Sequence, residues 1–149
     1  MKSYIVIVAD SGIMKAFSIR ERSLIHKGKA ELIKRTIYTA AHKKLSEQLS
    51  DRRGSFRGSG DARSARHGSG EAHKMMEEME KKSLQALAHD IEGVILHTPA
   101  DEYYLALPKH IYNGVTTAMK GSILSKIKKT LTKDLTKDSV EDIRKRFVV

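Results

Sequence analysis

An uninterrupted apolar run near the amino terminus constrains the fold of this chain most. Residues Tyr4–Ala9 read YIVIVA and end at Asp10. Because successive side chains of a strand point to opposite faces of the sheet, a run without polar residues predicts a central strand that is covered on both faces. Six apolar residues are too few for the hydrophobic region of a signal peptide or for a membrane span, so we expect a cytoplasmic protein.

Two further strands are expected to follow the first one closely. Asp10-Ser11-Gly12 supplies turn residues, and Met14–Arg20 then alternates between apolar and polar side chains. After a polar bend, Glu31–Tyr38 has the composition of a third strand. Three consecutive strands with short connections predict an antiparallel meander.

The second half of the chain predicts helices that alternate with strands. Further elements are expected as helices at Glu71–His89, Lys109–Lys120 and from the capping residue Ser139 onward, strands at Gly93–His97 and Leu124–Thr132, and a short helix at Ala40–Leu49. In the last strand, Ile127 and Leu131 are expected on one face and Lys126 and Lys128 on the other. The element order β-β-β-α-β-α-β-α predicts a single α/β domain over residues 1–149, with a mixed five-stranded sheet and helices on its faces.

Residues 50–70 form a segment that can bury almost nothing. Gly, Ser and Arg each occur five times in it, and Phe56 is its one large apolar residue. Loops longer than about 12–15 residues without secondary structure are usually functional or disordered. We therefore expect a flexible loop here, with five of the ten arginines of the chain: Arg52, Arg53, Arg57, Arg63 and Arg66.

The charge of the chain indicates a polyanionic partner. Lys and Arg together number 28 against 18 Asp and Glu, which gives a formal net charge of +10. Besides the arginines, a group of lysines that includes Lys126 and Lys128 lies between residues 120 and 137. A guanidinium group presents a planar fork that suits phosphate, whereas lysines also serve as ordinary solubilising charges. The excess favours nucleic acid over an acidic membrane surface.

Motifs for cofactors and metals are missing from the sequence. It contains neither the phosphate-binding loop G-x-x-x-x-G-K-[ST] nor a dinucleotide-binding glycine pattern. There is no cysteine, and the seven histidines have no metal-binding spacing. We therefore expect no cofactor and no metal ion.

Asp10 is the one carboxylate that invites a catalytic interpretation. Ribonuclease-H-like enzymes place a metal-binding Asp on their first strand, and Asp10 follows the first expected strand. The simpler interpretation is that Asp10-Ser11-Gly12 provides the residues that a tight hairpin needs. A second acidic ligand is missing after the strand expected at Gly93–His97, where His97 and Thr98 stand. Turn and catalysis remain as alternatives for Asp10.

Three blocks of the sequence are distinctive in combination: IVADSGIMKAFSI at 6–19, LSDRRGSFRGSGDARSARHG at 49–68 and KDLTKDSVEDIRKRF at 133–147. Together they resemble the bacterial host attachment protein family, which is related to the middle domain of archaeal and eukaryotic peptide-chain release factors. The resemblance implies a ribonuclease-H-like domain. In the release factors, the connection between the third strand and the long helix carries a Gly-Gly-Gln loop whose Gln helps water attack peptidyl-tRNA.

The corresponding segment of this chain has no Gly-Gly-Gln and no glutamine between residues 50 and 70, which speaks against an enzyme. We therefore expect a binding module that contacts RNA, either tRNA or the ribosome. The residues expected to bind nucleic acid are Arg52, Arg53, Phe56, Arg57, Arg63, Arg66, Lys126 and Lys128. The alternatives are a hydrolase acting on peptidyl-tRNA or RNA, and an adaptor for an acidic protein or surface polymer in host attachment. The sequence gives no indication of the oligomeric state.

Overall fold

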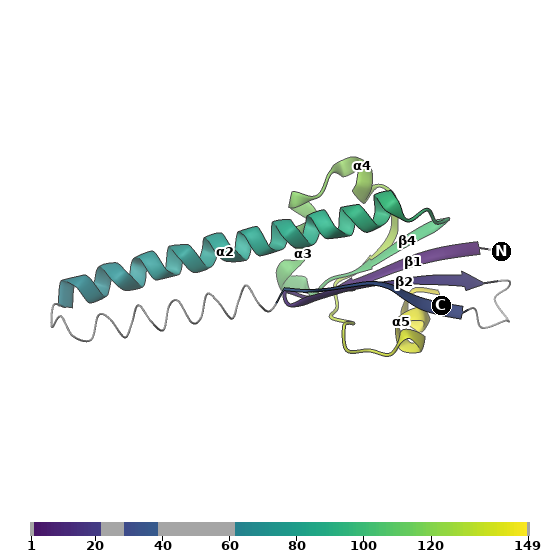
Figure 1. The fold of residues 1–149 in the computed structure, drawn as a ribbon, viewed down its shortest axis with the longest axis horizontal. Helices are drawn as coiled ribbons and strands as arrows, with labels where there is room; N and C mark the ends of the chain where they lie inside the picture. The colour runs from purple at the N-terminus through teal and green to yellow at the C-terminus, as the bar shows by residue number, and fades with distance from the viewer. Residues whose placement is uncertain (1, 22–28, 39–61, 149) are drawn as a thin grey trace.

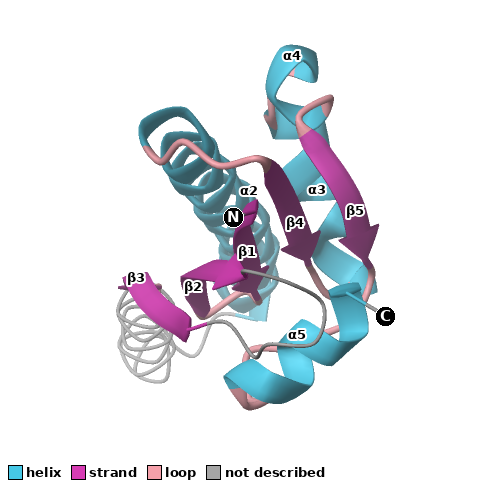
Figure 2. Ribbon diagram, turned by 90° about the vertical axis from the view of Figure 1, so that its right-hand side faces the viewer, coloured by secondary structure: helices cyan, strands magenta, loops and turns pink. Residues whose placement is uncertain are grey.

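The fold is built around one five-stranded sheet, shown in Figures 1 and 2. The computed structural model describes residues 2–21, 29–38 and 62–148. The strands are β1 (Lys2–Ala9), β2 (Ile13–Glu21), β3 (Lys29–Ile37), β4 (Glu102–Ala106) and β5 (Ile127–Leu131), in the sheet order β3-β2-β1-β4-β5. The helices are α2 (Ala62–His97), α3 (Lys109–Ala118), α4 (Gly121–Leu124) and α5 (Val140–Val148). The predicted α/β class with a mixed five-stranded sheet is confirmed.

The central strand predicted from the apolar run is confirmed as β1. It pairs antiparallel with β2 and parallel with β4, so it lies in the middle of the sheet. Its alternate side chains enter two separate cores, as the lack of polar residues predicts. Strands β1, β2 and β3 form the predicted antiparallel meander.

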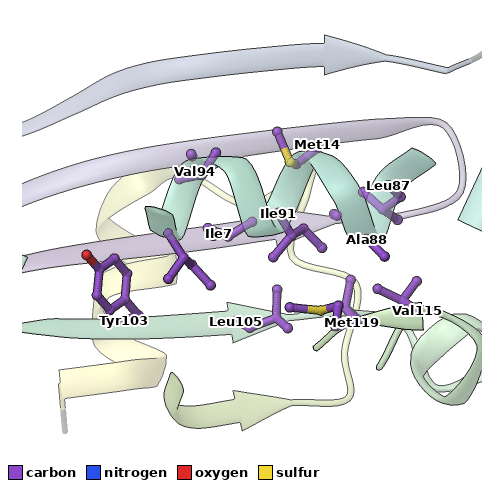
Figure 3. Packing of buried hydrophobic residues seen from close by; sticks show 14 of the residues in the cluster. Ile7, Met14, Leu87, Ala88, Ile91, Val94, Tyr103, Leu105, Val115 and Met119 are labelled. Carbon is purple, nitrogen blue, oxygen red and sulfur yellow. The ribbon is translucent and has the colours of Figure 1, made fainter. Parts of the chain in front are cut away.

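Helices cover the two faces of the sheet unequally. Among the helices that the structure describes, α2, α3 and α4 contribute to the core on one face, which we call the α2-side core, and α5 covers the other face, over the α5-side core. Figure 3 shows Leu87, Ile91 and Val94 of α2 beside Ile7 and Leu105 of the sheet. The amino-terminal half of α2 extends well beyond the sheet (Figure 1). None of the helices in the described ranges has the length and apolar character needed to cross a bilayer.

The prediction of a strand at Gly93–His97 is wrong, because these residues form the last turns of α2. Val94 and Ile95 are buried in the α2-side core and continue the helical spacing of Leu87 and Ile91. A short apolar run does not distinguish a buried strand from a buried helix turn. The fourth strand is instead β4, whose apolar residues are buried between β1 and β5.

The prediction of a loop at residues 50–70 is wrong for residues 62–70. Helix α2 begins at Ala62, so residues 62–70 are helical despite Gly68 and Gly70. Once a helix is nucleated, each added residue brings one further hydrogen bond, and a glycine lowers this gain by only about 1 kcal/mol. Residues 50–61 and the short helix predicted at Ala40–Leu49 lie outside the described residues.

The predicted alternation of β5 is also wrong, because the strand contains an irregularity. Tyr103 pairs with Ile127, but the next residue, Tyr104, pairs with Lys129, so one extra residue is inserted in β5. An insertion of one residue moves every following side chain to the opposite face. Accordingly, Ile127 packs against the α2-side core and Leu131 against the α5-side core.

The carboxyl-terminal helix α5 forms as the sequence predicts. The hydroxyl of Ser139 accepts a hydrogen bond from the backbone N–H of Asp142 at 3.2 Å, which is a cap of the first turn. Acidic residues occupy the first turn and basic residues the last one, in the order that the helix dipole favours. An ion pair of 2.5 Å between Arg144 and Glu21 joins α5 to β2.

Candidate functional site

Asp10 organises the turn between β1 and β2 at the carboxyl end of β1. Its Oδ1 accepts hydrogen bonds from the backbone N–H groups of Gly12 at 2.7 Å and Ile13 at 2.9 Å. A carboxylate that bonds the backbone two and three residues further on is the interaction expected of Asp in a tight turn.

The connection between β5 and α5 reaches the same turn from the other end of the chain. The hydroxyl oxygen of Thr136 lies 3.1 Å from Oδ2 of Asp10 and 2.6 Å from Oδ1 of Asp134. In addition, Nζ of Lys15 donates a hydrogen bond to the carbonyl of Thr136 at 2.8 Å. The sequence blocks at 6–19 and 133–147 therefore meet in space at this edge of the sheet.

At this junction of the β1–β2 turn with the β5–α5 connection, the polar side-chain atoms form hydrogen bonds within the junction. A hydroxyl has one proton, so Thr136 shares a single donor between two carboxylates, and both oxygens of Asp10 already have partners. Within the described parts of the chain, no three His, Asp or Glu side chains gather to hold a metal ion. The observed contacts of Asp10 hold the turn and the β5–α5 connection in place.

A second polar region lies at the opposite end of the strands, where β1, β4 and β5 begin on the α5 side. It is a hollow of about 350 Å³ that we call the lysine hollow. The side chains that line it are Lys2, Tyr4, Glu102, Tyr104, Lys128, Lys129 and Phe147. The irregularity in β5 explains why two consecutive lysines line one hollow, since a bulge redirects a side chain that regular alternation would place on the other face.

Glu102 lies between two of these lysines. Its Oε1 is 2.7 Å from Nζ of Lys2 and 2.7 Å from Nζ of Lys128, and its Oε2 accepts a hydrogen bond from the hydroxyl of Tyr104. The hydrogen bond from Lys128, followed by those from Lys2 and Tyr104, lowers the pKa of Glu102 to about 2. Its carboxylate is therefore charged at neutral pH and fixes the two ammonium groups close to one another.

The two lysines predicted to bind nucleic acid lie on opposite faces of the sheet. Lys128 lines the lysine hollow, next to α5. Lys126, just before β5, lines a different hollow of about 520 Å³ on the α2 side, together with Leu96, Asp101 and Tyr103. The structure does not bring these two side chains into one pocket.

The predicted arginine residues fall into two groups. Arg63 and Arg66 lie in the first turns of α2, in the part that extends away from the sheet. Arg52, Arg53, Phe56 and Arg57 lie outside the described residues.

The sequence interpretation missed most of the lysine hollow. Lys2, Glu102 and Lys129 were not predicted as site residues, because they are far apart in the sequence and meet only through the pairing of β1, β4 and β5. The parallel register sets Tyr4 directly beside Glu102. One signal was available in the sequence, since Lys128 and Lys129 interrupt an otherwise alternating strand.

Comparison with known proteins shows the family to which the chain belongs. No curated protein sequence and no solved structure was found to match the chain. A family model described as "Protein required for attachment to host cells" matches residues 5–147. This match covers nearly the whole chain, including both blocks that meet at Asp10 and Thr136. The chain therefore belongs to the family of proteins required for attachment to host cells.

Proposed function

We propose that this chain is a basic binding module that contacts the phosphate backbone of RNA, either tRNA or the ribosome, in the cytoplasm. The observation that carries the proposal is the unbalanced charge of the lysine hollow, where two ammonium groups contact one carboxylate and a third lysine lines the same hollow. Such a surplus attracts a polyanion, in agreement with the net charge of +10.

The arginine-rich region extends this contact surface. Arg63 and Arg66 stand on the part of α2 that extends beyond the sheet, and three more arginines precede them in the sequence. Guanidinium groups bind phosphate in a bidentate manner, and backbone contacts of this kind do not read the base sequence. RNA binding is therefore expected to show little preference for base sequence and to weaken strongly as the salt concentration rises.

The proposal also takes up the relation to release-factor domains. The strand order β3-β2-β1-β4-β5 is compatible with a ribonuclease-H-like label, and α2 follows the segment that corresponds to the Gly-Gly-Gln loop. Since no glutamine stands between residues 50 and 70, the proposal retains RNA contact and omits peptidyl-tRNA hydrolysis.

The test removes the five arginines and measures RNA binding. A variant with alanine at Arg52, Arg53, Arg57, Arg63 and Arg66 is titrated against bulk tRNA and a short single-stranded RNA at several salt concentrations, with fluorescence anisotropy as the readout. If about four to six phosphates are contacted, the log–log dependence of affinity on salt has a slope near −0.7 to −0.9 per contact, and the variant has a smaller slope.

A matched control removes the same number of charges from other places on the surface. It carries alanine at the exposed residues Lys34, Lys81, Lys82, Lys109 and Lys145. This control is expected to keep most of its affinity. Equal RNA binding by the arginine variant and the wild type would show that the arginines are not part of the contact surface, and the absence of salt-sensitive RNA binding by the wild type would overturn the proposal.

Two further assays separate the alternatives. Cleavage of RNA with Mg²⁺ or Mn²⁺, or release of peptide from peptidyl-tRNA, would indicate a hydrolase. The family description refers to attachment to host cells, so binding to an acidic surface polymer with no binding to RNA would indicate an adaptor and would contradict our proposal.

A further inference from the structure

We infer that the lysine hollow binds the terminal phosphate of a nucleotide, at an RNA chain end or in a free mononucleotide. The inference rests on the proposed function, because it takes RNA as the partner. It adds two points to that function. The binding place is the lysine hollow, and the group bound is a phosphate monoester and not an internal phosphodiester.

The arrangement of the lysines suits a single phosphate group. Nζ of Lys2 and Nζ of Lys128 are each 2.7 Å from the same oxygen of Glu102, so both lie within reach of one phosphate. An ammonium group has three N–H donors, and each of these two gives one to Glu102. Two donors on each lysine remain for a ligand, and the side chains are 53% and 58% exposed, so a ligand can reach them.

Lys129 adds a third cation to the same hollow. Its Nζ lies 3.5 Å from the backbone carbonyl of Arg146, at the outer limit of a hydrogen bond, so it is weakly held. The guanidinium of Arg146 is itself directed at the carboxylate of Asp138, at 3.4 Å. Lys129 is therefore the lysine of the hollow that has no carboxylate partner among the ion pairs of the described residues.

The charge of the hollow matches a phosphate monoester better than a diester. Among the side chains that line the hollow, three ammonium groups and the carboxylate of Glu102 leave two positive charges. A phosphate monoester carries about −1.5 to −2 charges at pH 7, whereas each phosphodiester of a chain carries one. A terminal phosphate therefore neutralises the surplus, and an internal phosphate leaves part of it uncompensated.

The floor of the hollow is expected to strengthen the attraction between the lysines and a phosphate. It consists of buried aromatic rings, with centroid distances of 5.9 Å between Tyr4 and Tyr104 and 5.3 Å between Tyr104 and Phe147. Apolar surroundings reduce the screening of nearby charges. The rings are buried and the hydroxyl of Tyr104 is occupied by Glu102, so they offer no open face on which a base could stack. The site is therefore expected to select the phosphate and not the base.

The test compares RNAs that differ only in their ends. Isothermal titration calorimetry of the full chain uses one short RNA with a 5′-phosphate, a 3′-phosphate or only hydroxyl ends, and also a nucleoside monophosphate and inorganic phosphate. We expect about tenfold tighter binding of a phosphorylated end, which corresponds to one net charge-assisted interaction. Because the buried rings offer no face for a base, we expect the nucleoside monophosphate and inorganic phosphate to bind with similar affinity. Failure of both to bind would overturn the inference, and much tighter binding of the nucleoside monophosphate would contradict the conclusion that the base is not selected.

Two substitutions with opposite effects distinguish binding from structural damage. Lys129→Gln removes one cation with little structural role and is expected to abolish the preference for phosphorylated ends. Glu102→Gln keeps an acceptor for the lysines but removes the negative charge, and is expected to raise the affinity for the phosphate. The matched control Lys133→Gln changes an exposed lysine outside the hollow and is expected to keep the preference.

The outcomes also separate this inference from the proposed function. Arginine-dependent, salt-sensitive RNA binding without any preference for phosphorylated ends would overturn the phosphate site and leave the proposed function intact. Lys129-dependent binding of the nucleoside monophosphate without binding of RNA would overturn the proposed function and support the site. A Glu102→Gln variant with lower phosphate affinity and an unchanged fold would contradict the charge argument.

Discussion

The hydroxyl oxygen of Thr136 lies 3.1 Å from Oδ2 of Asp10, although 126 positions separate the two residues in the sequence. Asp10 directly follows β1, the middle strand of the sheet, and Thr136 lies in the connection from the edge strand β5 to α5. The contact therefore ties the carboxyl-terminal part of the chain to its central strand. Thr136 is buried, with 3% exposure, so its polar atoms depend on these partners.

Replacing Thr136 by valine is expected to destabilise the protein. Valine has the same shape but no hydroxyl, so the carboxylates of Asp10 and Asp134 both lose a donor. The expected loss is about 1–3 kcal/mol in the free energy of unfolding, measured by urea denaturation. The control Thr117→Val, at an exposed position of α3, is expected to change stability by less than about 0.5 kcal/mol. Equal effects of both substitutions would contradict the role of the junction.

Two helical glycines are expected to respond differently to alanine. At Gly93 in α2, an added Cβ meets nothing within 4 Å, so Gly93→Ala gains the helix propensity of alanine, about 0.5–1 kcal/mol. At Gly114 in α3, the Cβ comes to 2.6 Å from Cδ1 of Leu84 in α2. The end of the Leu84 side chain must shift to make room there, and a shift of about 30° off its rotamer costs about 0.5–1.5 kcal/mol, which offsets the gain. Thermal denaturation of both variants measures the difference, and equal stabilisation would show that α2 and α3 are not closely packed at Gly114.

Much of the fold could be predicted from local patterns, and the errors have identifiable physical causes. The apolar run in β1 and the capped helix α5 depend on neighbouring residues, and both were predicted correctly. The run at residues 93–97 fits two periods, and only its packing against β1 and β4 makes it a helix. The face of each lysine in β5 depends on one inserted residue, which pairing with β4 determines.

The candidate site was less predictable than the fold, because its side chains meet only through the pairing of strands that are far apart in the sequence. Lys2, Glu102 and Lys128 come from three strands that lie far apart in the sequence and adjacent in the sheet. Charge composition indicates a polyanionic partner, but the grouping of these side chains requires the parallel pairing of β1 with β4 and of β4 with β5. The Asp10–Thr136 contact is equally long in range and equally absent from local patterns.

The network around Glu102 is expected to make the stability of the protein depend on pH in the acid range. The pKa of Glu102 is lowered from 4.5 to about 2 in the folded protein, first by the hydrogen bond from Lys128. Between these two values the unfolded state binds more protons, so the stability supplied by Glu102 is complete above about pH 4.5 and is lost as the pH falls towards 2. Urea denaturation at several pH values should show that wild type is more stable than Glu102→Gln at pH 6 and that this advantage shrinks through the same window. A constant difference at every pH would exclude this network as its cause.

The ion pair between Arg144 and Glu21 is expected to stabilise the packing of α5 on the sheet. The side chains are 17% and 3% exposed, and the contact of 2.5 Å is a charge pair and not an aligned hydrogen bond. Arg144→Met leaves the carboxylate of Glu21 buried without its cation, and the expected loss is about 3 kcal/mol. The control Arg146→Met in the same helix breaks a partly exposed pair with Asp138 and is expected to cost less than about 1 kcal/mol.

A double-mutant cycle separates the pair from the loss of helix packing. Adding Glu21→Met to Arg144→Met removes the unpaired buried carboxylate, so the double variant is expected to be more stable than Arg144→Met alone in urea denaturation. If the second substitution instead adds a further full loss of stability, the two side chains are not energetically coupled. In that case α5 is held on the sheet mainly by the apolar contacts of Ile143 and Phe147 in the α5-side core.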